Sequence, residues 1–476
     1  SQYILNLIKN IYFSYYNVLC TVPDDRVSSR RNLDIPEALD TLERCYRLLA
    51  SARPIRTPLS ASSNKSTPPH VLGRFLKRQV FDLIKYRITK LDHNLFDVIW
   101  PAVKKLPDNR NVVQIVEEDF PGGVTAPDYY VYEVFTEFMT PLIKDLHNIN
   151  INSDFPQHPI SDFKKNSLLS ESSQPLVEIN IDSGDDFVLT GTMECSRNLS
   201  GFELPLNLKI GKLEFVERII TTVLMRDDFA RIIEQLSPES DQKGGSYYTL
   251  NEILEKPSEI CAALAATGVL ISLCEREEID DCNRLHGKQW PYGRGVFVSD
   301  DKTVAVWINV HDHLRVVTST PADAPGEIGL TFSKLSCIMT YLHEKLDFVF
   351  DEKLGHLSSR PTFLGAGIRF SLIVNFPGLS KDIDNIKHLC AVRGLQYRET
   401  LSPDIARISN YQCLSITESN CFNDFVTATS NLLHLEKDVS MQNSAHITTM
   451  LSNIFRRKRS SLADIHDIEK FQAKTN

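Results

Sequence analysis

The feature that most constrains the fold is a set of runs in the second half of the chain in which apolar residues recur at nearly every second position. β-branched side chains are frequent in these runs, which read "FVLTGTMEC", "GVFVSDDKTVAVWINV", "HLRVVTST" and "RFSLIVNFP". Such alternation is typical of strands with one buried face. The polar "SDDK" at 299–302 favours a hairpin turn, and helical patterns near 212–236 and 328–348 lie between the strands. We therefore expect an α+β domain, a large antiparallel sheet flanked by helices.

The preceding block, residues 70–150, has the apolar spacing of helices instead. Apolar residues fall on one helical face in "VLGRFLKRQVFDLIKYRI" (71–88) and again in "YYVYEVFTEFMTPLIKDLHN" (129–148). The stripes are Leu72, Phe75, Leu76, Val80, Leu83 and Ile84 in the first segment, and Val131, Val134, Phe135, Phe138 and Met139 in the second. Because such stripes bury one face of each helix, a small all-helical domain is expected.

An N-terminal extension, residues 1–69, precedes the helical block. It contains apolar residues at helical spacing over 4–19 and a connector at 52–69 that is rich in Ser, Pro and Thr. Lys9 and several asparagines make 4–19 a poor match to a signal core or a membrane span. We expect an amphipathic helix that docks either on the body of the protein or on another protein.

A linker and a tail complete the predicted organisation. The polar, Pro-containing linker is expected at 151–183, which places the sheet domain at 184–436. The tail, 437–476, contains four consecutive basic residues, Arg456–Arg459. Such a run indicates a solvated tail, a localisation signal or a contact with an anionic partner.

Composition excludes several classes of function. The chain has 476 residues, of which 42% are hydrophobic and 24% are charged, as in an ordinary globular protein. Its net charge of −9 argues against a general nucleic-acid or membrane-surface binder. The ten cysteines form no Cys-x-x-Cys pair, and no apolar run reaches the ~18 residues of a membrane span. We expect a cytoplasmic protein with reduced thiols, no metal site and no membrane or nucleic-acid partner.

Several segments, in their order along the chain, point to one family. They are "RFLKRQVFDLIKYRIT", "GGVTAPDYYVYEVFTEFMTPLIKDLHN", "CSRNLSGFELPLN", "GGSYYTL", "WPYGRGVFVSDDKTVAVWIN" and "DHLRVV". With them, residues 70–435 resemble the phosphagen kinases (ATP:guanidino phosphotransferases), and among these the arginine kinases, because the specificity-loop region is short. The resemblance implies a small helical N-terminal domain and a C-terminal domain built on a curved antiparallel sheet. The implied chemistry moves the γ-phosphoryl group of Mg-ATP onto a guanidinium nitrogen.

The resemblance also implies a cage of arginines around the phosphates, because planar guanidinium groups bind phosphate oxygens with two donors each. The family carries two of these arginines in a Ser-Thr-Arg-Val-Arg run, where this sequence has Thr192 and Glu194. Glu194 sets a carboxylate against the polyphosphate. The arginines that match the rest of the cage, as remnants of a nucleotide site, are Arg315, Arg369 and Arg398. Each has an alternative interpretation as an ordinary surface or strand-end arginine.

The Gly-punctuated stretch at 355–367, "GHLSSRPTFLGAG", has the composition of a loop that cradles an anion with backbone N–H groups. In the family this stretch carries a reactive-cysteine motif, Cys-Pro-Thr-Asn-Leu-Gly-Thr. Here Arg360 takes the place of the thiolate and Phe363 that of the asparagine. A guanidinium group reverses the charge that faces a cationic substrate. The resemblance therefore implies a turn that is retained for packing.

The family's catalytic carboxylates are replaced as well. Its Asn-Glu-Glu-Asp-His sequence reads "NVHDHLR", which puts Val310 and His311 at the positions of both glutamates. Val310 can bind neither a magnesium-bound water nor a guanidinium. His311 is either a base near neutral pH or a structural or exposed histidine, and a protonated imidazole would repel a cationic substrate. In the mobile loop, "RETLSPD", Pro403 stands where the family has a glutamate that holds the substrate.

These substitutions together indicate a loss of guanidino kinase activity. A missing general base costs roughly 10²–10⁴-fold in rate, and a lost electrostatic donor costs roughly 10²–10³-fold. We expect an arginine-kinase-like pseudoenzyme that acts as a scaffold in a larger cytoskeletal, axonemal or ciliary assembly. It would bind protein partners through 4–19 and the tail, without a cofactor. The alternatives are a divergent active arginine kinase that uses the three arginines with His311 as base, or a sensor that binds Mg-ATP without turnover.

Overall fold

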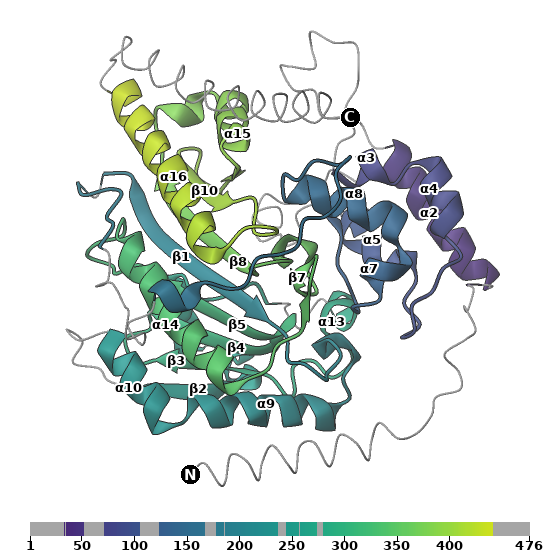
Figure 1. The fold of residues 1–476 in the computed structure, drawn as a ribbon, viewed down its shortest axis with the longest axis horizontal. Helices are drawn as coiled ribbons and strands as arrows, with labels where there is room; N and C mark the ends of the chain where they lie inside the picture. Colours follow the sequence, from purple (N-terminus) through teal and green to yellow (C-terminus); the bar gives the residue numbers. More distant parts are fainter. Residues whose placement is uncertain are drawn as a thin grey trace, which may run out of the picture.

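The computed structural model describes residues 33, 35–51, 71–104, 123–166, 178–184, 186–236, 244–256, 258–273 and 279–440. The helix expected at 4–19, the connector at 52–69 and the basic run at 456–459 lie outside these residues. Figure 1 shows a sheet domain with a smaller, all-helical domain beside it. The α+β architecture expected from the sequence is thereby confirmed.

Among the described residues, eight strands form one antiparallel sheet in the larger domain. In spatial order they are β2 (Gly245–Thr249), β3 (Gly295–Ser299), β4 (Val304–Val310), β5 (Asp312–Ser319), β1 (Val188–Arg197), β8 (Ile368–Asn375), β10 (Ile405–Asn410) and β9 (Leu395–Glu399). The hairpin turn expected at 299–302 joins β3 to β4 and is confirmed, with Lys302 in the left-handed region at φ 60°. The expected strand runs correspond to β1, the β3–β4 hairpin, β5 and β8.

Alternation along the strands gives the sheet two different faces. Met193 and Cys195 of β1 belong to a large apolar core on one face. Thr192 and Glu194 point to the opposite face, because successive side chains of a strand alternate. The helices that contribute to the large core are α9 (Ile210–Leu224), α10 (Asp227–Leu236), α14 (Ile328–Lys345), α15 (Ile383–Val392) and α16 (Glu418–Ser440).

The opposite face of the sheet is covered around its β3–β4 end by a second apolar core. Trp307 of β4 is fully buried there and donates from its indole nitrogen to the Val269 carbonyl at 3.0 Å. The helices of this core are α11 (Leu250–Leu254) and α12 (Glu259–Thr267). The short elements of the chain are α13 (Ile279–His286), β6 (Phe350–Asp351), β7 (Gly355–His356), and the 3₁₀ turns η2 (Phe163–Asn166), η3 (Pro205–Asn207), η4 (Pro361–Phe363) and η5 (Leu379–Lys381).

The helical domain packs around a separate apolar core, which also includes Leu364 and Leu414 from the sheet domain. Its helices are α2 (Pro36–Ser51), α3 (Val71–Phe75), α4 (Arg78–Ile84), α5 (Leu95–Lys104), α7 (Val131–Val134) and α8 (Thr136–Leu146). Val131, Phe135 and Phe138 are fully buried, as the second apolar stripe predicts. Leu42 and Leu49 of α2 join the same core, so this core also includes residues that precede position 70.

The first apolar stripe, over 71–88, differs from the expectation. The helix is interrupted between α3 and α4, so one continuous helical face does not form. Phe81 and Ile84 of α4 are fully buried, whereas Leu83 is 55% exposed. Leu83 lies about 100° around the helix from Ile84 and about 200° from Phe81, so it cannot share their face. Its expected place on the buried stripe is therefore wrong.

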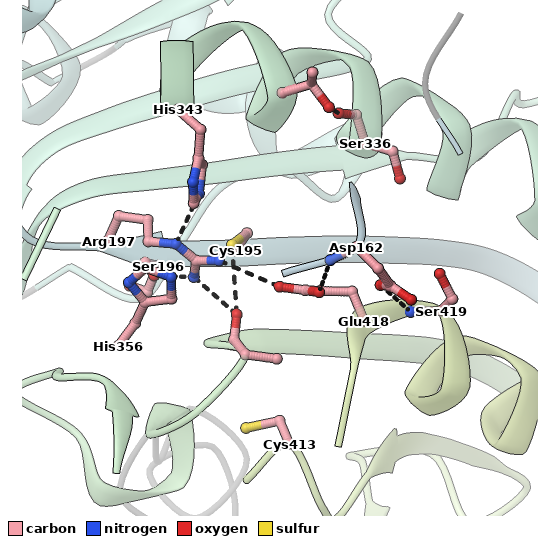
Figure 2. A network of polar contacts seen from close by, with 12 residues as sticks. Asp162, Cys195, Ser196, Arg197, Ser336, His343, His356, Cys413, Glu418 and Ser419 are labelled. Atoms are coloured by element: carbon pink, nitrogen blue, oxygen red, sulfur yellow. Dashed lines mark hydrogen bonds and ion pairs between the residues drawn. The ribbon is translucent and has the colours of Figure 1, made fainter. Parts of the chain in front are cut away.

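A buried polar network ties the sheet to the helices around it (Figure 2). Arg197, at the end of β1, is fully buried. Its Nε donates to Nε2 of His343 in α14 at 3.2 Å, and its Nη2 lies 3.6 Å from Oε1 of Glu418 in α16. The backbone N–H of Asp162 donates to Glu418 at 2.9 Å, and that of Ser419 donates to Asp162 at 3.0 Å. This network fastens the segment that joins the two domains to the first turn of α16.

Candidate functional site

A cavity of about 690 Å³ lies on the sheet face opposite α14. Strands β1, β5, β8, β9 and β10 supply its floor, and residues between 253 and 273 supply a wall. The polar side chains that reach it from the strands include Thr192, Glu194, Arg315, Arg369, Arg398 and Arg407. The structure thus brings together the three arginines expected as cage remnants and the two residues, Thr192 and Glu194, that the sequence resemblance aligns with family arginines.

Strand pairing explains why these side chains meet. Glu194 of β1 is the register partner of Arg369 in β8, and Arg407 of β10 is the register partner of Arg398 in β9. Directly opposed residues in an antiparallel pair point to the same face. Sequence reasoning missed Arg407. Arg407 and Ser409 are two residues apart on β10, so they point to the same face of the sheet, and both line the cavity.

Thr192 occupies a narrow part of the cavity. Gly268, which ends α12 with φ 80°, approaches it so closely that a Cβ atom there would lie 3.2 Å from Thr192 Cγ2. A left-handed conformation at this point favours glycine. The close approach of α12 suits a short side chain on β1 at this position.

Glu194 and Arg315 form a tight ion pair inside the cavity. Nε and Nη2 of Arg315 lie 2.7 Å and 2.6 Å from the same carboxylate oxygen, Oε2 of Glu194. The two side chains are 5% and 14% exposed, for arginine and glutamate respectively. Charge-assisted hydrogen bonds of this length are strong where water has little access. The Glu194 carboxylate therefore fixes the Arg315 guanidinium inside the cavity.

Phe363 lies at the centre of a group of guanidinium side chains. The guanidinium carbon of Arg360 lies 4.0 Å from the ring centroid, that of Arg369 lies at 5.1 Å and that of Arg315 at 5.7 Å. Cations at such distances are attracted by the ring's negative face. Phe363 and Arg360 are 3% and 1% exposed, so the ring is a buried platform that separates the three cations.

Asp312 supplies a second fixed carboxylate beside this group. It is fully buried and accepts from Ser196 Oγ at 2.9 Å, Asn198 Nδ2 at 2.9 Å, Ser358 Oγ at 2.6 Å and the backbone N–H of Ser359 at 2.8 Å. Burial alone would raise the pKa of Asp312. The Arg360 guanidinium and these hydrogen bonds outweigh burial and hold that pKa below its usual value. The Asp312 carboxylate is therefore the fixed negative charge that faces Arg360.

The loop at 355–367 does not cradle an anion, so that interpretation of its glycines is wrong. Its amides are used inside the protein: Ser359 donates to Asp312, Phe363 to the Arg360 carbonyl and Ala366 to the Cys413 carbonyl. Gly365 has φ 95°, and a Cβ atom there would lie 2.4 Å from a backbone carbonyl oxygen. The glycine is required by this close approach.

The helical domain closes directly over the same loop. The Ala126 amide donates to the Ser359 carbonyl at 2.7 Å, and Tyr132 Oη donates to the Ser358 carbonyl at 2.6 Å. His147 Nε2 donates to the Pro361 carbonyl at 2.8 Å. These bonds run between the two domains, so the loop around Arg360 is fixed by both of them.

Val310 and His311, which the sequence resemblance aligns with the family's carboxylates, do not line the arginine-lined cavity. Val310 is fully buried in the core around Trp307. His311 is 8% exposed, has φ 70° and packs against His286 at 4.7 Å between ring centroids. It lines a separate space of only about 10 Å³ between the domains. The alternative in which His311 is exposed is therefore wrong, and its packed position is that of a structural histidine. Pro403 is exposed in the turn between β9 and β10.

Neither a metal centre nor a membrane-spanning helix is found among the described residues. Within these residues, no group of three or more His, Cys, Asp and Glu side chains could hold a metal ion. None of the helices in the described ranges has the length and apolarity that crossing a membrane requires.

Fold and site together define a two-domain α+β protein with an arginine-lined cavity on its sheet. Residues 68–144 match the family described as ATP:guanido phosphotransferase, N-terminal domain, and residues 228–439 match the C-terminal catalytic domain of the same family. The two matches together cover more than half of the chain. The chain therefore belongs to the phosphagen kinase family.

Relatives with known names agree with this assignment. An arginine kinase of Penaeus vannamei is 26% identical over 378 residues, which cover 78% of this chain and 93% of the relative. An arginine kinase of Homarus gammarus is 26% identical over 377 residues, with coverage of 78% and 93%. These identities extend over both domains, in agreement with the family assignment.

Solved structures share the fold. The duplicated taurocyamine kinase of Schistosoma mansoni with bound transition state analog components has a TM-score of 0.61 at 21% identity, over 84% of this chain and 48% of its own. The present chain thus spans about half of that duplicated protein. Lombricine kinase has a TM-score of 0.56 at 22% identity, over 78% of this chain and 93% of its own.

Proposed function

We propose that this phosphagen kinase homologue is a non-catalytic, arginine-kinase-like protein that serves as a scaffold in a larger assembly. The observation that carries the proposal is the buried guanidinium of Arg360, which is 1% exposed and lies against Phe363 under the closed helical domain. Phosphoryl transfer to a guanidinium requires a site that attracts that cation and positions it in line with the phosphate. A fixed cation at this place opposes both requirements.

Two further observations support the loss of chemistry. Glu194 binds Arg315, so this arginine is already neutralised before any phosphate arrives. His311, the residue that a divergent kinase would use as its base, lines a different and much smaller space from the one that Arg315, Arg369 and Arg398 line. A general base must lie within hydrogen-bond reach of the proton that it removes.

The activity assay that tests this proposal supplies Mg-ATP and arginine to the purified full chain. The arginine kinase of Penaeus vannamei serves as the positive control under identical conditions. We expect turnover at less than about 10⁻⁴ of the control rate, because several groups that act as a unit are replaced. Arginine phosphorylation above that level by the wild-type chain would contradict the proposal and favour a divergent active kinase.

The scaffold role rests on the two segments outside the family core, 4–19 and the tail at 437–476. We propose that these segments bind protein partners in the cytoplasm, in a cytoskeletal or ciliary setting. Co-sedimentation with polymerised tubulin tests the cytoskeletal part of the proposal. The full chain is expected to sediment with the polymer, and a variant that lacks 4–19 is expected to remain in the supernatant. Equal sedimentation of the two proteins would contradict a role for this segment.

A second candidate function, an ATP-binding sensor without turnover, is favoured by one observation. Arg369, Arg398 and Arg407 line a cavity of about 690 Å³, a volume in the range of ligand pockets. Thermal unfolding of the full chain with and without millimolar Mg-ATP separates the two candidates. A clear rise in Tm without arginine turnover would favour the sensor, whereas an unchanged Tm would favour the scaffold.

A further inference from the structure

We propose that Glu194 determines which anions the cavity accepts. Its carboxylate acts as a built-in counter-ion of Arg315 and lowers the affinity of the cavity for polyphosphates relative to organic ligands that carry a single carboxylate. This inference rests on the proposed function, in which the cavity does not serve phosphoryl transfer from Mg-ATP. It adds a specificity-determining residue and a ligand class to that cavity.

The Glu194–Arg315 pair neutralises one side of the cavity. Nε and Nη2 of Arg315, on strand β5, lie 2.7 Å and 2.6 Å from Oε2 of Glu194 on the neighbouring strand β1. Since Glu194 is 14% exposed and lines the cavity, its negative charge faces any ligand that enters. An anion that binds Arg315 would have to displace the carboxylate of Glu194, which is part of strand β1.

Positive charge remains on the other side of the cavity, over β8, β10 and β9. Arg369 is the register partner of Glu194, and Arg407 is the register partner of Arg398 on the next pair of strands. Within the described part of the chain, the Nε of Arg369 is buried and makes no hydrogen bond. Since Arg369 also lines the cavity, its cation would stabilise an anionic group bound there.

The rest of the lining suits an apolar ligand body. Ser371 and Ser409 form a hydroxyl pair, with 2.9 Å between their Oγ atoms, beside the arginines. Ile373 on the floor and Leu254 and Ile271 on the wall add apolar surface to the same cavity. A carboxylate near Arg369 with an apolar body against these side chains satisfies both parts of the lining.

Charge arithmetic explains the selectivity. Coulomb repulsion between Glu194 and a ligand grows in proportion to the ligand's charge. A tripolyphosphate therefore suffers several times the repulsion that a benzoate ion suffers at the same distance. Attraction to the arginines on β8, β9 and β10 grows with the ligand's charge in the same way, so Glu194 does not exclude a polyanion but removes more of its binding free energy than of a monoanion's. Removing the charge of Glu194 should accordingly help the polyanion far more than the monoanion.

The experiment measures the dissociation constants of benzoate and sodium tripolyphosphate by calorimetry, with the full chain and its Glu194→Gln variant. We expect Glu194→Gln to strengthen tripolyphosphate binding at least about tenfold and to change benzoate binding less than about threefold. Glu194→Asp keeps the charge and should keep the wild-type preference. Glu255→Gln removes a carboxylate from the exposed rim of the same cavity and is the matched control, with little change expected for either probe.

Several outcomes would overturn the proposal. They are an unchanged ratio of the two dissociation constants in Glu194→Gln, an absence of tripolyphosphate binding to that variant, and an absence of benzoate binding to the wild-type chain. Equal Tm values of the free proteins check that the variants fold. The arginine phosphorylation assay tests the proposed function separately, because it reads turnover by the wild-type chain and not the preference between two anions.

Discussion

Replacing Arg197 by methionine tests whether the network in Figure 2 holds the sheet, α14 and α16 together. The substitution keeps much of the aliphatic volume but removes the cation that faces Glu418 at 3.6 Å. Glu418 is 1% exposed, so its carboxylate would remain buried without a counter-charge. Breaking a buried ion pair by removing one partner costs about 3–5 kcal/mol. We expect a fall of that size in the free energy of unfolding.

The pH dependence gives this prediction a second readout. Burial already raises the pKa of Glu418, and Arg197 is the main charge that opposes the rise. Without Arg197 the folded-state pKa of Glu418 moves further above its value in the unfolded chain. A group of this kind contributes most stability below its unfolded pKa and loses it as pH rises through the folded pKa. The loss of stability in Arg197→Met should therefore be larger at pH 8 than at pH 5.

Urea unfolding followed by tryptophan fluorescence measures both quantities. Glu418→Gln and the double variant complete a mutant cycle, in which the double variant should lose less stability than the sum of the two single variants. The difference reports the coupling between the two side chains. A loss below about 1 kcal/mol in Arg197→Met, or a loss that does not depend on pH, would refute the reasoning.

Three further predictions follow from the fold. Burial, assisted by Arg197, lowers the pKa of His343 to about 3. The free energy of unfolding should therefore fall as pH drops from about 6.5 toward 3, by up to about 1.4 kcal/mol per pH unit for this group. Urea unfolding at pH 7 and pH 5 measures this fall, and equal free energies at the two pH values would contradict the prediction. Gly365→Ala should destabilise the protein strongly, because its Cβ atom would lie 2.4 Å from a carbonyl oxygen. Gly394→Ala has open space around the new Cβ atom, so it should cost only the ~1 kcal/mol of backbone strain at φ 73°. Thermal unfolding compares the two variants. Phe81→Ala should cost about 3–5 kcal/mol and Leu83→Ala less than about 0.5 kcal/mol in the same measurement, since only Phe81 is buried.

The sequence predicts the fold well where a single periodicity governs a segment. The alternating runs that become β1, β5 and β8 are examples, because strand pairing follows from which face each side chain must bury. The stripe over 71–88 fails for the opposite reason. The helix ends at Phe75 and a new helix begins at Arg78, and the spacing of apolar residues does not reveal this interruption. Leu83 then points to solvent although its spacing fits the stripe.

The candidate site shows the same division. The resemblance to a family places Arg315, Arg369 and Arg398 around one cavity, and the structure does so too. Residue identities alone could not reveal that Arg315 is held by Glu194, because the pair depends on the relative register of β1 and β5. The charge of Arg360 is visible in the sequence, but its burial against Phe363 is a property of the packed loop.

The two charged side chains Glu194 and Arg360, which lie around Phe363 and its neighbouring arginines, are best understood together. A cage of arginines without a bound phosphate carries mutual repulsion, which phosphate oxygens would normally relieve. In this chain Glu194 faces Arg315 and Asp312 faces Arg360, so two of the three cations near the ring have a fixed carboxylate. The ring itself attracts all three at 4.0–5.7 Å. Two of the three cations beside the ring are therefore balanced by the protein's own carboxylates, which favours a fold that keeps them in place without a nucleotide.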